Sequence, residues 1–121
     1  MTTLEIMKKA KAAAPFMRTV TTEQKNAALL AIADAVTAQS PAILAENAKD
    51  VEAAEGVISP TMIDRLLLNE KRIQDIADSI RCVAELDDPV GKVLSRTVHK
   101  NGLIIEKTAV PMGVIAIIYE S

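Results

Sequence analysis

The residues able to perform covalent or acid–base chemistry in this chain are few, and they lie far apart in the sequence. Cys82 is its only cysteine and His99 its only histidine. The pattern predicts that Cys82 lies nearly opposite the apolar stripe of a helix and near its C-terminus, where the helix dipole disfavours a thiolate. His99 has no companion His or Cys with which to bind zinc. We therefore predict no catalytic residue and no metal site in this chain.

Carboxylates occur in pairs on the predicted helices, three or four residues apart, which places both members on one helix face. The pairs are Glu46 with Asp50, Glu52 with Glu55, and Asp75 with Asp78. Lysines and arginines are interspersed with them, so a solvated helix surface is the simplest interpretation. The four glycines are widely separated, and they form neither of the common nucleotide-binding glycine fingerprints.

The elements that must position these residues are mainly helices. Apolar residues recur at helical spacing through the first 86 residues and predict five helices. The first covers about 3–14, the second follows a cap at Thr21 or Thr22, and the third ends at Gly56. Ser40, Ser59 and Asn69 are the predicted caps of the last three helices, and the sequence Asp87-Asp88-Pro89 should end the fifth.

A β-hairpin is predicted after these helices. The apolar period changes to two from Val93 onward, and the dipeptide Asn101-Gly102 separates two arms at about 94–100 and 103–109. Such a dipeptide favours a type I′ turn, in which both central residues have positive φ. The pattern predicts an amphipathic hairpin with one face available for burial. Because an isolated hairpin is marginal in water, it should rest on other structure.

The last stretch, 109–121, contains Val and Ile without polar alternation, which is typical of a parallel strand covered on both faces. A parallel neighbour requires a crossover connection of a dozen or more residues, and no chain follows Ser121 to supply one. The chain therefore resembles the front end of a longer protein. Ligands of open α/β sheets bind at the carboxyl ends of the strands, here at Tyr119, Glu120 and Ser121.

The composition and the charge distribution argue against several classes of function. Half of the 121 residues are apolar, and the formal net charge is −2, with basic residues scattered rather than grouped. This distribution argues against a nucleic-acid surface. The longest apolar stretch is far shorter than the roughly 20 residues of a membrane-spanning helix, and the N-terminus has no secretory pattern. With a single cysteine, these features predict a cytoplasmic protein that binds neither membrane nor nucleic acid.

The segment Val-Pro-Met-Gly-Val-Ile-Ala-Ile-Ile-Tyr-Glu-Ser at 110–121 resembles the strand-to-loop motif of the gamma-glutamyl phosphate reductase family, also called glutamate-5-semialdehyde dehydrogenases. Residues 101–107 are similar to the hairpin of that family, and residues 47–50 resemble its third-helix signature. Met112 and Ala116 depart mildly from the Leu and Gly usual there. The ending Tyr119-Glu120-Ser121 separates this family from other aldehyde dehydrogenases.

The resemblance implies an α/β fold of the aldehyde dehydrogenase type, with a Rossmann-type cofactor domain. It implies an enzyme of proline biosynthesis that reduces L-glutamyl 5-phosphate with NADPH, releasing phosphate and L-glutamate 5-semialdehyde. The nucleophilic cysteine of such enzymes lies far downstream of residue 121. By motif position, cofactor contacts fall on Ile118, Tyr119, Glu120 and Ser121. The resemblance also implies a homo-oligomer in the complete enzyme, with the hairpin in an oligomerisation sheet.

The implied organisation has three parts: 1–92 as the helical N-terminal part of the cofactor-binding domain, 93–110 as the hairpin, and 111–121 as the first strand of a truncated Rossmann-type domain. We expect this fragment to be inactive alone, and the reading frame to continue past Ser121 toward a downstream cysteine. A free-standing helical interaction module, docking through its hairpin and apolar C-terminus, is the alternative. A superfamily member acting on a free aldehyde or acyl-CoA is disfavoured by the Tyr119-Glu120-Ser121 ending.

Overall fold

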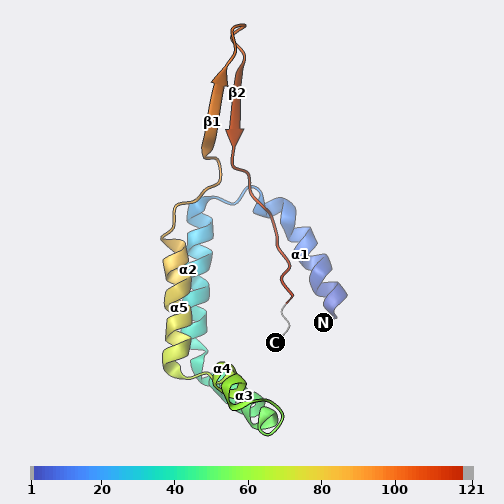
Figure 1. Ribbon diagram of the computed structural model, residues 1–121, viewed down its shortest axis with the longest axis vertical. Coiled ribbons are helices and arrows are strands. Elements are labelled where there is room, and N and C mark those ends of the chain that lie inside the picture. The colour runs from blue at the N-terminus through green and yellow to red at the C-terminus, as the bar shows by residue number, and fades with distance from the viewer. Residues whose placement is uncertain (1, 119–121) are drawn as a thin grey trace. The chain divides into compact units, whose positions relative to one another are not determined.

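The computed structural model describes residues 2–118, within which the chain forms five helices and a two-stranded antiparallel sheet (Figure 1). The elements are α1 (Thr3–Met17), α2 (Thr22–Ala38), α3 (Ser40–Ala54), α4 (Pro60–Leu66), α5 (Glu70–Ala84), β1 (Val93–Val98) and β2 (Ile104–Thr108). The chain divides into two compact units, one of which is Glu23–Leu86 while the other combines the residues before and after it. The predicted helical chain with a hairpin is confirmed. The assignment of 1–92, 93–110 and 111–121 to parts of a larger fold stays a prediction.

Local side-chain hydrogen bonds explain where several helices begin. Ser59 caps α4 by accepting from the Met62 N–H, and Asn69 caps α5 by accepting from the Arg72 N–H at 2.8 Å, as predicted. The prediction for Ser40 was wrong. Ser40 is already helical, and the N-cap position belongs to Gln39, whose side chain makes no capping hydrogen bond. The Gln39 N–H donates to the Ala35 carbonyl at the end of α2, and the Gln39 carbonyl accepts from the Ile43 N–H in α3.

The start of α1 carries a signal that the sequence prediction did not use. Thr2 and Glu5 form a capping box, in which the Thr2 hydroxyl accepts from the Glu5 N–H and the Glu5 carboxylate accepts from the Thr2 N–H at 2.7 Å. The spacing Thr-x-x-Glu is the sequence signature of this motif. The helix that follows is longer than predicted and extends to Met17, with Pro15 inside its last turn.

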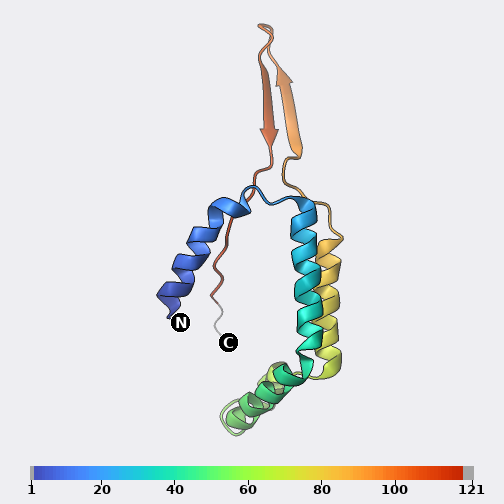
Figure 2. The ribbon, with the colours of Figure 1, turned by 180° about the vertical axis from the view of Figure 1, so that it is seen from behind.

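The core of the Glu23–Leu86 unit is small and lies between α2 and α5, which run side by side in both ribbon views (Figures 1 and 2). Ala33 of α2 and Ala77 of α5 are fully buried, and Ile73 is nearly so. Arg81 of α5 bridges to Asp34 of α2, with 2.8 Å between Nη2 and Oδ1. Small side chains at the contact allow the two helices to approach closely.

A buried amide connects α3 to the segment between α4 and α5. Asn47 of α3 is only 8% exposed, and its Nδ2 donates to the Leu66 carbonyl at 2.9 Å. Its Oδ1 accepts from the Leu68 N–H at 2.7 Å. Arg72 of α5 donates to the carbonyls of Asp64 and Leu67 and pairs with the Asp64 carboxylate. These contacts satisfy backbone groups that the end of the short helix α4 leaves without helical partners.

The hairpin turn differs in type from the prediction. Among the described residues, none other than glycine has positive φ, so Asn101 does not adopt the conformation that a type I′ turn requires. Instead, Gly102 (φ 85°) donates to the His99 carbonyl, and the Asn101 Oδ1 accepts from the Leu103 N–H. A three-residue loop with glycine in the left-handed position is another common hairpin connection, and the same dipeptide suits it.

The prediction of an amphipathic hairpin was also wrong, whereas its burial against other structure stays a prediction. Val98 pairs with Ile104 and Arg96 with Glu106, so one face carries both apolar and charged side chains. The other face likewise combines Ile105 with Lys107. Every residue of β1 and β2 is exposed. An irregularity between Val93 and Ser95 shifts the register, and simple alternation in the sequence does not show it.

Among the described residues, no single helix combines the length and apolar content needed to cross a membrane, although α2 and α3, bent by 65° at their junction, pass on length and composition when taken together.

The Asn47 contacts generate a stability prediction. Replacing Asn47 with Ala removes both hydrogen bonds and leaves the Leu66 carbonyl and the Leu68 N–H unpaired, so the free energy of unfolding should fall by about 2 kcal/mol. Urea denaturation followed by circular dichroism measures this change. Lys49→Ala, two residues along the same helix, removes only an exposed ion pair and should cost less than about 0.5 kcal/mol. Equal losses in the two variants would contradict the role assigned to Asn47.

Candidate functional site

The start of the C-terminal segment is fixed by a group of hydrogen bonds at the base of the hairpin. Asp88 accepts from the Thr22 hydroxyl at 2.8 Å and from the Val90 N–H at 3.0 Å. Gly91 (φ 84°) donates to the Ala109 carbonyl, and the Ala109 N–H donates to Lys92, both at 2.9 Å. These bonds extend the pairing of β1 and β2 to the last residue before the apolar segment.

The apolar segment 110–118 forms no strand within the described chain, which differs from the buried strand predicted over 109–121, while the place of 111–121 in a larger sheet stays a prediction. Its residues have no regular secondary structure, and most of its large side chains are exposed. No backbone hydrogen bond joins 110–118 to another described residue. The physical reason is the one that identified the segment as unusual: a strand requires a paired neighbour, and the described residues supply none.

The predicted cofactor contacts lie at the end of this segment. Ile118 is described and is 90% exposed. Tyr119, Glu120 and Ser121 lie outside the described residues. The contact of these four residues with a cofactor therefore stays a prediction.

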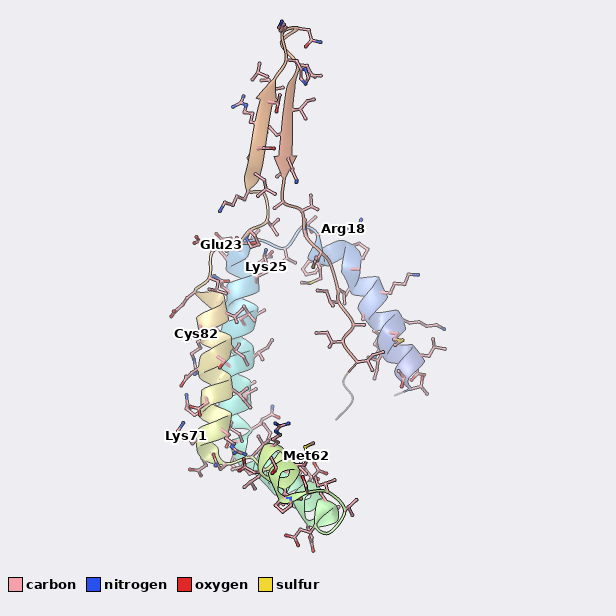
Figure 3. All side chains as sticks on the ribbon, in the orientation of Figure 1. Arg18, Glu23, Lys25, Met62, Lys71 and Cys82 are labelled. Atoms are coloured by element: carbon pink, nitrogen blue, oxygen red, sulfur yellow. The ribbon has the colours of Figure 1, made fainter. Side chains whose placement is uncertain are left out.

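Neither candidate for covalent or acid–base chemistry has a catalytic setting in the described part of the chain. Cys82 is a free, exposed thiol in the last turn of α5 (Figure 3), as the helical pattern predicted. His99 is exposed and takes part in the hairpin turn through its backbone, which accepts from Gly102 and donates to Leu103.

Three of the carboxylates that share helix faces pair with basic side chains in the described structure, namely Glu46, Asp75 and Asp78. Glu46 pairs with Lys49 and Asp75 with Lys71, both at 2.7 Å, and all four side chains are well exposed. Arg81 donates to the carboxylates of Asp34 and Asp78, and these hydrogen bonds, the one to Asp34 foremost, raise the pKa of the guanidinium above its ordinary value. Within residues 2–118, no group of three His, Cys, Asp or Glu side chains could hold a metal ion. The solvated-surface interpretation fits this geometry.

Comparison with known sequences shows which proteins this chain is similar to. The chain is 52% identical over 119 residues to the gamma-glutamyl phosphate reductase of Carboxydothermus hydrogenoformans, covering 98% of this chain and 29% of the relative. It is 55% identical over 112 residues to the enzyme of Neisseria meningitidis serogroup C, covering 93% and 27% respectively. The chain is a homologue of the gamma-glutamyl phosphate reductases. The family resemblance drawn from the motif at 110–121 is confirmed.

Solved structures of gamma-glutamyl phosphate reductases match the fold as well. The crystal structure from Thermotoga maritima has a TM-score of 0.84 at 38% identity, covering 89% of this chain and 26% of that one. The enzyme of Saccharomyces cerevisiae gives 0.80 at 31% identity, covering 88% and 28%. No model in the scan of protein families matches the chain.

The chain spans less than a third of these reductases, namely 27–29% of the first curated relatives and 26–28% of the two solved chains. The match lies in the N-terminal part of the relatives.

Hydrogen exchange tests the description of the apolar segment. The amides of Val114, Ile115 and Ile117 should exchange at nearly unprotected rates in the 121-residue chain, because they have no described partner. The amide of Ala109, bonded to Lys92, should exchange more slowly. Residue-resolved exchange by NMR at several protein concentrations provides the measurement. Protection of the three amides equal to that of Ala109 at the lowest concentration would contradict the absence of a partner within the chain.

Proposed function

We propose that this chain is the N-terminal part of an NADPH-dependent reductase that converts L-glutamyl 5-phosphate to L-glutamate 5-semialdehyde and phosphate, in proline biosynthesis. The observation that carries the proposal is identity of 52–55% over nearly the whole chain to proteins named gamma-glutamyl phosphate reductase. Agreement of the backbone with two solved reductases supports it. The balanced reaction consumes one NADPH and one proton, and it yields NADP⁺ together with the two products.

The role proposed for this chain is structural and cofactor-positioning. By motif position, Ile118, Tyr119, Glu120 and Ser121 would lie along the cofactor, and the backbone at the described end of this segment suits such a contact. Ile118 is almost fully exposed, and its N–H and carbonyl bond to no other described residue, so they are available to a ligand. NADPH, when bound, supplies the hydride of the reaction. The rest of a Rossmann-type domain would come from the sequence that follows in the relatives.

The remaining parts of the chain would serve assembly rather than chemistry. The hairpin exposes all its strand residues, and both of its strands have an unpaired edge within the described chain. An exposed edge of this kind invites pairing with another polypeptide. We propose that it contributes to a homo-oligomer of the complete enzyme, located in the cytoplasm. No catalytic residue is assigned within the chain, and the nucleophilic cysteine would lie downstream.

A graft tests the proposal directly. Residues 1–121 would replace the matched segment of the Carboxydothermus hydrogenoformans reductase, and the reverse reaction would be followed as NADPH formed from NADP⁺, phosphate and L-glutamate 5-semialdehyde. We expect kcat/KM within about tenfold of the parent enzyme, because about half of the matched residues are identical. The 121-residue chain alone should show no turnover. Turnover by the chain alone, or an inactive graft that is folded by circular dichroism, would contradict the proposal.

A second measurement separates Cys82 from the nucleophile. In the graft, Cys82→Ser should leave kcat within about twofold, because the thiol is exposed and the proposed nucleophile lies downstream of residue 121. Substitution of the true nucleophile by Ser should lower kcat by several orders of magnitude. If Cys82→Ser reduced turnover that far, the nucleophile would have been misplaced.

A further inference from the structure

The carboxylate of Asp88 connects two parts of the chain that are far apart in the sequence. One of the two compact units combines Met1–Thr22 with Asp87–Ser121. Within this unit, the Asp88 Oδ2 accepts from the Thr22 hydroxyl at 2.8 Å, across 66 residues of sequence. Both residues are half-buried, and a hydrogen bond to a charged acceptor is among the stronger kinds. Asp88 therefore joins the end of the first part of the unit to the beginning of the second.

The same carboxylate fixes the turn that leads into β1. Its Oδ1 accepts from the Val90 N–H at 3.0 Å, a bond that Asp side chains often make in turns. The Lys92 N–H donates to the Pro89 carbonyl at 3.2 Å, and Gly91 has the positive φ that a type II turn requires at its third residue. The backbone between Asp88 and β1 therefore has little freedom.

This turn is bonded to the residue that precedes the apolar segment 110–118. The Gly91 N–H donates to the Ala109 carbonyl, and the Ala109 N–H donates to the Lys92 carbonyl, both at 2.9 Å. Backbone hydrogen bonds fix the direction of 110–118 only at this start, because none joins the segment to another described residue. A continuous series of bonds thus leads from the Asp88 carboxylate to the origin of the segment.

We propose that Asp88 is a positioning residue for the cofactor. It fixes the origin of the segment which, under the proposed function on which this inference rests, leads to the cofactor contacts at 118–121. A backbone contact with a ligand tolerates little displacement, because a hydrogen bond weakens steeply when its distance or angle changes. Loss of the Thr22–Asp88 bond should therefore weaken cofactor binding, although neither residue touches the cofactor.

The other role open to Asp88 is stabilisation of its unit without any effect on the cofactor. Asp87 provides the matched control, because it carries the same charge one residue earlier and is exposed. Thr22 provides a second pair of variants. Thr22→Val keeps the shape of the side chain and removes the hydroxyl, whereas Thr22→Ser keeps the hydroxyl.

Hydrogen exchange in the 121-residue chain tests the first half of the proposal without cofactor or substrate. We expect Asp88→Ala to raise the exchange rate of the Ala109 amide about fivefold, after correction for intrinsic rates, and Asp87→Ala to change it less than about twofold. NMR provides the residue-resolved rates. Equal effects of the two variants would overturn the proposal. If Asp88→Ala prevents folding, Thr22→Val replaces it, with the same comparison.

Cofactor binding by the full-length graft tests the second half. We expect Thr22→Val to raise the KM for NADP⁺ about fivefold and the KM for L-glutamate 5-semialdehyde less than about twofold. Calorimetry should show the same rise in the dissociation constant of NADP⁺ alone. Thr22→Ser and Asp87→Ala should leave that constant within about twofold of the parent graft. A Thr22→Val variant that has a lower Tm but unchanged NADP⁺ binding would show a purely structural role and overturn the proposal.

The outcome is distinguishable from that of the proposed function. An active graft in which Thr22→Val binds NADP⁺ as tightly as the parent would overturn the positioning role and leave the reductase assignment intact. A folded graft that binds NADP⁺, more weakly after Thr22→Val, but shows no turnover would contradict the reductase assignment and preserve the positioning role.

Discussion

A β-strand exists only where a second strand satisfies its backbone hydrogen bonds, and this constraint determines which parts of the chain have regular structure. The helices satisfy their own backbone and form over most of 3–84. β1 and β2 are joined by a short loop and pair with each other. The segment 110–118 has equally strong strand-forming residues, but no described partner, and it remains irregular. Intrinsic preference for a strand is therefore not sufficient without a neighbour.

Local signals in the sequence were the most reliable. Ser59 and Asn69 cap their helices as predicted, because capping depends only on residues within one turn. The prediction for Ser40 failed because α3 begins one residue earlier than the Ser-Pro pair indicates, so that Ser40 is itself helical and Gln39 occupies the cap position. The Asn101-Gly102 pair located the hairpin correctly but not its turn type, since glycine in the left-handed position suits both types.

Tertiary features were harder to predict. The helical pattern does not distinguish Asn47 from other polar residues of its helix. Its burial depends on the Leu66–Leu68 segment, which is about 20 residues away in the sequence. Ile76 and Val83 of α5 are apolar and recur at helical spacing with Ile73, Ala77 and Ala84, yet only the last three are buried within this segment, and the spacing alone does not show this difference. For the site, the motif at 110–121 identified the relatives, whereas its contact with a cofactor involves residues of which only Ile118 is described. The motif was therefore sufficient to predict the relatives, but it did not predict the conformation of the segment that carries it.

The two hydrogen bonds between Ala109 and the Gly91-Lys92 pair have a mechanical consequence. They make Ala109, the residue just before the apolar segment, part of the hydrogen-bond ladder that continues into β1 and β2. The direction in which the segment starts is therefore coupled to the orientation of the hairpin. If another polypeptide binds the hairpin and changes its orientation, the direction in which 110–118 leaves the ladder changes with it. Gly91 lies at the base of this ladder and has positive φ, so a side chain at this position would strain the backbone.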